Sequence, residues 1–514
     1  MPRPLLIRAA AAFALLAAAH AGDSARVARP AQHTITGDLT LDRAVFIAIQ
    51  QNPDVLKQLA EIERTRGLII QARAQALPHL SLTTTYDQQD PRLTEQQSGS
   101  GGRVPQILIP TGLPPGPGQP APTVDLGPLF SRSSGSFQSP DKTWSINFEV
   151  KQVIYAGGAV SAAIRAQKFT GERAYYQLRD VIDATIASVR AQFYTVLTNR
   201  SLITVAEETV HLQEELVADQ RNRLDAGTVP RFNVLRAEVE LANVVPTMIR
   251  ARNEYVLSEL SLAKLLGLDA ASGGQPRFHC VGELAVNERP FDIGQALDLA
   301  KARRPFLKAE RQLIKIQAEK IKIAFAGYLP QLNGQAGYQI RNSRLTDDID
   351  SSVDGWFFGV AGNWKLFDGL ETFGQVKEAK AALEIAKIGY DDAVQGVELE
   401  VQQAYANLTT ARATIKSQQK NVEQAREALR LSDERLNAGA GSQLEVLDAR
   451  VALTRAQTTE LVARGDYNKA LAEFDRATAT DTSYVESFRD PLKKLEAEVL
   501  ARPHPKFRAR AHIR

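Results

Sequence analysis

Few residues of this 514-residue chain have the types and spacing that bond chemistry needs. None of the seven His residues forms an HxxxH or HExxH pair, the spacing that binds zinc on a helix. The sequence has no GxSxG or Walker-type motif, and Gly157-Gly158 lacks the further glycines of a phosphate-binding loop, so it predicts a strand-to-helix turn. The single cysteine, Cys280, excludes an intramolecular disulfide and is interpreted as a linker residue without chemistry. We therefore expect no enzyme activity, no cofactor and no metal.

The charged pattern that remains is a pair of carboxylates. Glu445 and Asp448 are three residues apart, so on a helix they share one face. The stretch Ser442-Gln443-Leu444-Glu445 is a capping box that explains Glu445, whereas Asp448 has no such explanation. The chain has 62 Lys and Arg against 59 Asp and Glu, a formal net charge of +3, which argues against nucleic acid as a partner.

These carboxylates lie in a segment that the chain contains twice. Residues 223–241 (RLDAGTVPRFNVLRAEVEL) align without a gap with 435–453 (RLNAGAGSQLEVLDARVAL), at an offset of 212 (435 − 223). Residues 41–56 align with 293–308 at an offset of 252 (293 − 41). The first copy therefore carries about 40 extra residues (252 − 212), and the sequence predicts two structural repeats.

Most of each repeat is predicted to be helical. Gly227 and Gly439 suit left-handed helix caps, so the two aligned segments are expected at the ends of long antiparallel helical hairpins. Pro246 predicts a kink or break in the first copy only, because the second has Thr458 there. Apolar residues at steps of three and four predict a packed seam along the first long helix: Leu178, Ile182, Ile186, Val189, Phe193 and Val196. The second repeat continues this pattern at Val422, Leu447 and Val451.

Two alternating segments in each repeat predict strands of about ten residues. Trp144, Ile146, Phe148 and Val150 take one face of their strand and polar residues take the other, as in outer-membrane barrel strands. A secreted protein with an ordinary amphipathic sheet would alternate in the same way. The four predicted strands have no evident second layer to cover their apolar face, which favours lipid as the partner. Four strands cannot close a channel and lipid tolerates no open edge, so several chains must combine.

The remaining segments complete the predicted organisation. Arg3, Arg8, a short apolar run and Ala19-His20-Ala21 predict a signal peptide over residues 1–21, without a cysteine for a lipid anchor. The tail 481–514 is basic and is interpreted either as a solvated, partly disordered end or as a contact with peptidoglycan or a partner. The full division is a first repeat 38–270 (strands 78–87 and 143–154, a mobile Pro/Gly/Ser-rich loop 88–140, helices 158–226 and 230–267), a linker 271–291, and a second repeat 292–480 (strands 330–341 and 355–367, helices 370–438 and 442–478).

Over about residues 38–480 the chain resembles the TolC-type outer-membrane efflux proteins. The resemblance rests on the two-copy layout, the paired strands, the turns at 155–158 and 367–369, and the two hairpin ends. It implies a mostly α fold with a membrane β-barrel: a homotrimer whose 12-stranded barrel continues as an α-helical tunnel through the periplasm. It also implies a periplasmic adaptor and an inner-membrane pump as partners. The adaptor contacts implied are Arg223, Leu224, Gly227, Val234, Leu235, Arg435, Leu436, Gly439, Val446 and Leu447.

The resemblance further places an acidic constriction of the tunnel at Glu445 and Asp448, where the first repeat has Asn233 and Arg236. A ring of such carboxylates would attract cations. We hypothesise that Arg236 pairs with Asp448 on a neighbouring hairpin and holds the tunnel mouth closed. The expected function is an outer-membrane exit channel, with small-molecule efflux favoured. A protein secretion duct of the same family and a soluble extracytoplasmic coiled-coil scaffold stay as alternatives.

Overall fold

The computed structural model describes residues 37–88, 90, 108–110, 123–125, 142–268, 278–286, 289–342 and 352–480. The chain divides into two compact units. We call them the helical unit (Met1–Ile69, Ala166–Gln317 and Ala381–Arg514) and the sheet unit (Ile70–Arg165 and Ala318–Lys380). The predicted signal peptide, most of the predicted loop 88–140 and the basic tail lie outside the described residues.

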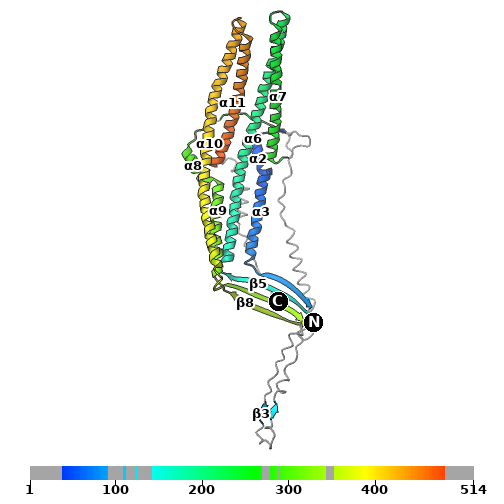
Figure 1. The fold of residues 1–514 in the computed structure, drawn as a ribbon, viewed down its shortest axis with the longest axis vertical. Helices are drawn as coiled ribbons and strands as arrows, with labels where there is room; N and C mark the ends of the chain where they lie inside the picture. The colour runs from blue at the N-terminus through cyan, green and yellow to red at the C-terminus, as the bar shows by residue number, and fades with distance from the viewer. Residues whose placement is uncertain are drawn as a thin grey trace, which may run out of the picture. The chain divides into compact units, whose positions relative to one another are not determined.

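Both repeats contain the same sequence of elements (Figure 1). The first has α2 (Leu41–Gln51), α3 (Pro53–Ala74), β2 (His79–Gln88), β5 (Lys142–Ala156), α6 (Ala159–Asp225) and α7 (Arg231–Leu266). The second has α8 (Ile293–Arg303), α9 (Pro305–Phe325), β7 (Gln331–Asn342), β8 (Ser352–Asn363), α10 (Glu371–Asn437) and α11 (Gln443–Thr478). The long helices α6 and α10 both have 67 residues, and α7 and α11 both have 36. The gap-free alignment of the hairpins is therefore also a structural equivalence.

The breaks between α2 and α3 and between α8 and α9 are built alike. Asn52 lies in the first break, and its side-chain amide donates a 2.8 Å hydrogen bond to the carbonyl oxygen of Leu265 near the end of α7. Arg304 lies in the second break, and its guanidinium donates to the carbonyl oxygens of Arg476 and Ala477 in the last turn of α11, at 3.2 and 3.5 Å. In each repeat, a side chain in the break thus satisfies carbonyls that the end of the hairpin leaves open.

The core of the helical unit follows the predicted seam of α6. All six seam residues, from Leu178 to Val196, are buried, and they pack in one cluster with apolar residues of α2, α3 and α7. The seam of the second repeat is less regular. Val422 and Leu447 are buried, but Val451 is exposed, so the prediction is wrong at that position.

Pro246 does not break α7, which runs without interruption from Arg231 to Leu266. A proline inside a helix removes the hydrogen bond to the carbonyl four residues earlier, here that of Ala242. Both Pro246 and Ala242 are exposed, so water can satisfy this carbonyl without a break in the helix. A break at Pro246 is therefore wrong, and a kink there stays a prediction.

The predicted linker 271–291 contains a strand. β6 (Phe278–Cys280) pairs in parallel with β1 (Gly37–Leu39), and Leu39 lies opposite Cys280. Cys280 is fully buried, and burial raises the pKa of its thiol to about 12. The residue is thus part of a core rather than of a loop, in an environment that keeps the thiol protonated. Strands of three residues are too short for a periodic signal, which is why the sequence does not reveal them.

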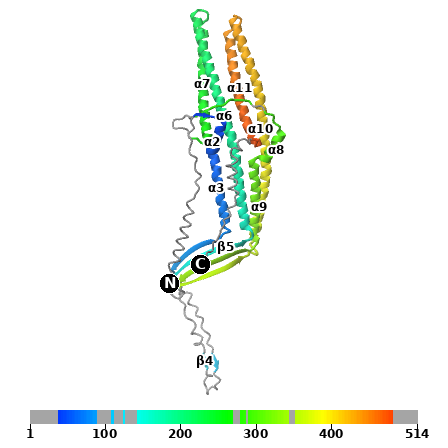
Figure 2. The same ribbon diagram turned by 180° about the vertical axis from the view of Figure 1, so that it is seen from behind.

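The sheet unit contains four antiparallel strands in the order β2-β5-β7-β8 (Figure 2). Gly157 and Gly158 have φ values of 59° and 83° and form the predicted turn from β5 into α6. β8 ends at Asn363 rather than at the predicted residue 367. The next residue, Trp364, instead donates its indole N–H to the carbonyl oxygen of Tyr328 at 3.0 Å.

Two further strands lie within the predicted loop 88–140. β3 (Leu108–Pro110) and β4 (Thr123–Asp125) pair with each other in an antiparallel ladder. They were not predicted, because three residues show no alternation.

In the part of the chain that the structure describes, no helix combines the length and the apolar character that a membrane crossing requires.

Candidate functional sites: the hairpin ends and the apolar sheet face

The first hairpin ends in a Schellman turn at Gly227. This glycine has a φ of 73°, in the left-handed region that other residues enter only with strain. Its amide donates to the carbonyl oxygen of Leu224, and the amide of Thr228 donates to that of Arg223, both at 2.9 Å. These two bonds close α6. Pro230 then precedes α7 without a side-chain cap.

The second hairpin ends in the same way at Gly439, with a φ of 72°. Here the next helix has a side-chain cap, because Ser442 Oγ accepts a 3.3 Å hydrogen bond from the amide of Glu445. The Glu445 carboxylate also lies 3.7 Å from the guanidinium of Arg435, and both side chains are well exposed. Such an exposed pair contributes little to stability. The predicted cap by Ser442 is confirmed, and the Glu445 carboxylate accepts a 3.3 Å hydrogen bond from Ser442 Oγ.

An apolar contact joins the two hairpins close to their ends. Leu447 on α11 packs against Leu216 and Val217 on α6 and Ala237 on α7, and only 8% of Leu447 is exposed. Its repeat equivalent is Leu235 (447 − 212), which is 49% exposed. The two repeats therefore differ in the burial of this equivalent leucine. One is used inside the chain, and the other is available to another molecule.

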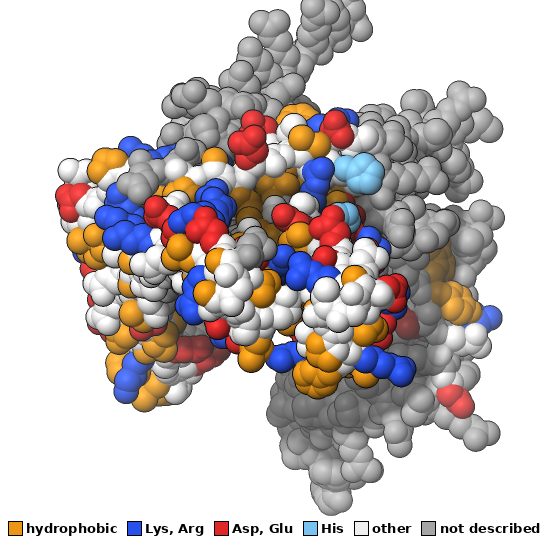
Figure 3. All heavy atoms as spheres, turned by 90° about the horizontal axis from the view of Figure 1, so that it is seen from above, with side chains coloured by type: hydrophobic (Ala, Val, Ile, Leu, Met, Phe, Trp, Pro, Cys, Tyr) orange, Lys and Arg blue, Asp and Glu red, His pale blue; other side chains and the backbone are white. Residues whose placement is uncertain are grey.

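The ten predicted adaptor contacts differ in accessibility. Viewed onto the hairpin ends, the surface mixes charged side chains of both signs with apolar ones (Figure 3). A partner would meet only the exposed members directly, because the buried ones pack the hairpins. Arg223, Gly227, Leu235, Arg435 and Gly439 are exposed, Leu224 and Leu436 are half-buried, and Val234, Val446 and Leu447 are buried.

The residues of the predicted constriction lie near the ends of the two hairpins. Arg236 on α7 and Asp448 on α11 are both exposed. Among the described residues, no ion pair joins them. The hypothesised Arg236–Asp448 pair stays a prediction, and Asp448 stays the better candidate for a charged ring because Glu445 is engaged locally.

The second candidate site is the apolar face of the sheet. Its register places the apolar side chains of the four strands in rows, and in the single chain Trp356 and Phe358 are 86% and 90% exposed. The opposite face is mostly polar, and its apolar side chains include Phe357, Val353 and Val153; the ring of Phe357 lies beside Gly337. Apolar surface this continuous marks contact with a partner or a membrane. The two central rows are Leu82, Phe148, Tyr338, Trp356 and Leu80, Val150, Ala336, Phe358.

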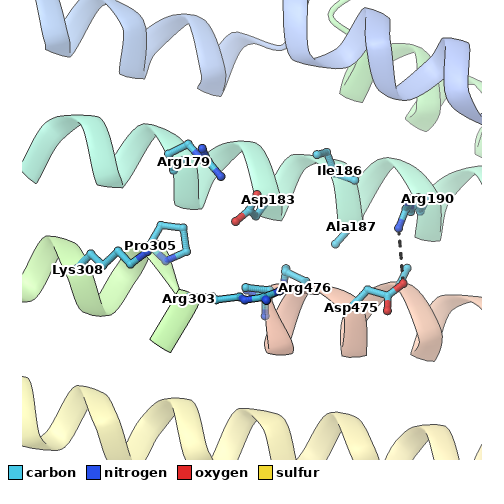
Figure 4. Close-up of a pocket in the computed structure, with 12 residues that line it drawn as sticks. Arg179, Asp183, Ile186, Ala187, Arg190, Arg303, Pro305, Lys308, Asp475 and Arg476 are labelled. Atoms are coloured by element: carbon cyan, nitrogen blue, oxygen red, sulfur yellow. Dashed lines mark ion pairs between the residues drawn. The ribbon is translucent and has the colours of Figure 1, made fainter. Parts of the chain in front are cut away.

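No group of three or more His, Cys, Asp and Glu side chains among the described residues is arranged to hold a metal ion. A cavity rich in arginine lies between α6 and the helices α8, α9 and α11 (Figure 4). Sequence patterns carry no signal for this cavity, because its residues come from segments that only the fold brings together.

A four-stranded sheet with one exposed apolar face and two long helical hairpins are the parts of an outer-membrane channel subunit. The model of the outer membrane efflux protein family matches residues 46–268 and 296–480. The chain belongs to this family, and the predicted resemblance is confirmed.

Relatives and a solved structure agree with this assignment. The outer membrane efflux protein BepC of Brucella suis is 23% identical, over 63% of this chain and 69% of that protein. The alkaline protease secretion protein AprF of Pseudomonas aeruginosa is also 23% identical, over 62% of this chain and 64% of AprF. The CmeC outer membrane channel of Campylobacter jejuni has a similar fold, with a TM-score of 0.67 at 14% identity, over 88% of this chain and 89% of CmeC.

The predicted fold class and location are therefore confirmed. The chain is an outer-membrane channel protein with a helical tunnel in the periplasm. Its family consists of channel proteins rather than enzymes. The alternative of a soluble coiled-coil scaffold does not fit this family.

Proposed function

We propose that three copies of this chain form one passive exit duct, in which four strands from each copy close a barrel of twelve. The observation that carries the proposal is the exposure of Trp356 and Phe358 on a sheet whose outer strands are β2 and β8. Lipid accepts the apolar face but not an open backbone edge, so β2 of one copy must pair with β8 of the next. Four strands alone are too few to enclose a channel.

The partners of the duct would be a periplasmic adaptor at the hairpin ends and an inner-membrane pump that supplies the energy. The duct itself would perform no bond chemistry. Small molecules are the favoured class of cargo. The relative BepC, which is named as an efflux protein, supports this choice. Protein secretion is the second candidate, because the relative AprF is named as a secretion protein.

Deletion of the gene from its source bacterium tests this function. We expect the deletion strain to accumulate a fluorescent efflux dye and to become more sensitive to several antimicrobial compounds. A plasmid copy of the gene should restore both properties. Unchanged dye accumulation together with a protein newly retained inside the cells would reject efflux in favour of secretion.

Chemical cross-linking in the outer membrane tests the trimer. It should give a band at three times the chain mass, and a monomer alone would reject the trimer.

Leu235→Glu is expected to weaken adaptor binding by about tenfold or more while leaving the outer-membrane trimer intact. The physical reason is that Leu235 is an exposed apolar side chain at the hairpin end, and a charge there would have to be buried in the contact. The measurement is co-purification of the cross-linked adaptor, with dye efflux as the cellular readout. Ile249→Glu is the matched control, because Ile249 is exposed on the same helix but farther from the end. Equal losses of adaptor binding in both variants would contradict the assignment of the adaptor contact to the hairpin end.

Asp448→Ala and Arg236→Ala are expected to raise single-channel conductance in planar bilayers. Both changes would remove the proposed pair between chains, and Asp448→Ala would also lower the preference for cations, because it removes the charged ring. Asp466→Ala is the control, since its exposed carboxylate pairs with Lys469 away from the hairpin end. Unchanged conductance in both test variants would reject the pair.

A further inference from the structure

The arginine-rich cavity is a feature that the duct function does not use. It has a volume of about 250 Å³ and lies within the helical unit, between α6 of the first repeat and α8, α9 and α11 of the second. Five cationic side chains line it: Arg179, Arg190, Arg303, Lys308 and Arg476. Figure 4 shows Arg179 on α6 facing the segment that carries Arg303, Pro305 and Lys308.

Two of these five cations have carboxylate partners. Arg190 pairs with the lining residue Asp475 at 3.8 Å. Arg476 pairs with Glu473 at 2.6 Å and also contacts Glu400. Such pairs neutralise both guanidinium groups.

The other three cations of the lining are Arg179, Arg303 and Lys308. Within the described ranges, no carboxylate forms an ion pair with Arg179, Arg303 or Lys308. Asp183 is the second carboxylate in the lining, so the cavity keeps an excess of positive charge. Burial, followed by the charges of Arg179, Arg311 and Arg303, lowers the pKa of Lys308. The same repulsion would be relieved by a bound anion.

The cationic lining is not a requirement of the fold. The repeat equivalents of Arg179, Arg303 and Lys308 are Asp391 (179 + 212), Gln51 (303 − 252) and Leu56 (308 − 252). The equivalent positions therefore carry one carboxylate, one amide and one apolar side chain. None of the three equivalent positions carries a cation, so the repeat fold does not require these side chains, and cations that repel one another at this site call for a role other than packing.

We propose that this cavity binds a compact, doubly charged oxyanion of the phosphate class, held by Arg179, Arg303 and Lys308. Guanidinium groups present paired N–H donors that match the oxygens of a phosphoryl group, and the lysine adds a point charge. The volume accommodates such a group with several waters, each of which takes about 30 Å³. The bound oxyanion would tie α6 of the first repeat to α9 of the second. Its source is either free phosphate or the phosphoryl group of a larger molecule.

Calorimetric titration of the purified full-length protein in detergent tests the site. We expect saturable binding of inorganic phosphate and none of chloride at the same ionic strength. The double variant Arg179→Gln/Lys308→Gln should bind at least about tenfold more weakly, a loss of about 1.4 kcal/mol. Glycerol 3-phosphate serves as the second ligand. Tighter binding of this ester would assign the site to a larger phosphorylated molecule, and tighter binding of phosphate would assign it to the free ion.

A matched control separates the cavity from general surface charge. Lys387→Gln removes an exposed lysine of α10 and should leave phosphate binding unchanged. The single variant Arg303→Gln, at an exposed position, covers the case in which the double variant fails to fold. Absence of saturable binding of both ligands to the unmodified protein would overturn the proposal. Equal weakening by Lys387→Gln would overturn it as well.

Discussion

The melting temperature of the protein is expected to fall sharply when Gly267 is replaced by alanine. Gly267 caps the C-terminal end of α7, and its amide donates to the carbonyl oxygen of Lys264 at 3.1 Å. A Cβ atom at this position would lie 2.2 Å from the backbone oxygen of Gln51, at the break between α2 and α3. This oxygen belongs to the backbone, so the clash can be relieved only if the break between α2 and α3 moves, whereas a flexible side chain could rotate away. We expect a loss of about 1–3 kcal/mol from overpacking, in addition to about 1–2 kcal/mol from the left-handed backbone.

Gly227→Ala is the matched control for this prediction. Gly227 has nearly the same φ, 73° against 71°, but a Cβ atom there would meet nothing within 4 Å. It should therefore lose only the backbone contribution. Thermal melting followed by circular dichroism at 222 nm compares the two variants, and similar melting temperatures would contradict the close-packing argument.

The second repeat supplies an independent reason to assign the loss to the clash. Ala479 is the repeat equivalent of Gly267 (267 + 212), and it adopts a left-handed φ of 50°. An alanine is thus tolerated in this conformation when the neighbouring junction leaves room. The difference between the repeats lies in the contact with Gln51, because backbone conformation alone permits an alanine.

The parts of the fold that local chemistry specifies could be predicted from the sequence. The predicted ends of the long helices, at 226, 267, 438 and 478, lie within one residue of the observed ends. Three of the four observed ends are followed within two residues by a glycine with a left-handed φ, at 227, 267 and 439. The alternation of Leu82, Phe148 and Trp356 likewise identified the apolar face that the strand register brings together.

The parts that depend on contacts between distant segments could not be predicted. Neither the pairing of β1 with β6 nor the end of β8 at Asn363 leaves a local signal. The difference between Leu235 and Leu447 is invisible in an alignment of two identical residues, because it arises from what packs against each. At Pro246 the local signal predicted a break that the structure does not have, because exposure decides whether the missing hydrogen bond breaks the helix.

The amount of trimer in the outer membrane is expected to fall strongly when Phe358 is replaced by lysine. In the single chain, Phe358 is 90% exposed, and in water a lysine at such a position would be harmless. In lipid, a lysine on the outer face of a barrel costs about 2–4 kcal/mol near the bilayer midplane. Three chains would multiply this cost in one assembly. A loss of trimer therefore indicates a lipid-facing sheet, and an unchanged amount of trimer indicates a solvent-facing one. No substitution at the hairpin ends separates these two cases as clearly.

Gln339→Lys provides the control, because Gln339 lies on the polar face of the adjacent strand β7, opposite Gly355. If the polar face lines the barrel interior, this lysine stays hydrated and the trimer should form normally. Both variants are compared by outer-membrane fractionation and by electrophoresis without heating, which preserves a detergent-stable trimer. Normal trimer from Phe358→Lys would mean that water rather than lipid covers the apolar rows. In that case the exposure of Trp356 and Phe358 would no longer support a barrel closed by three chains.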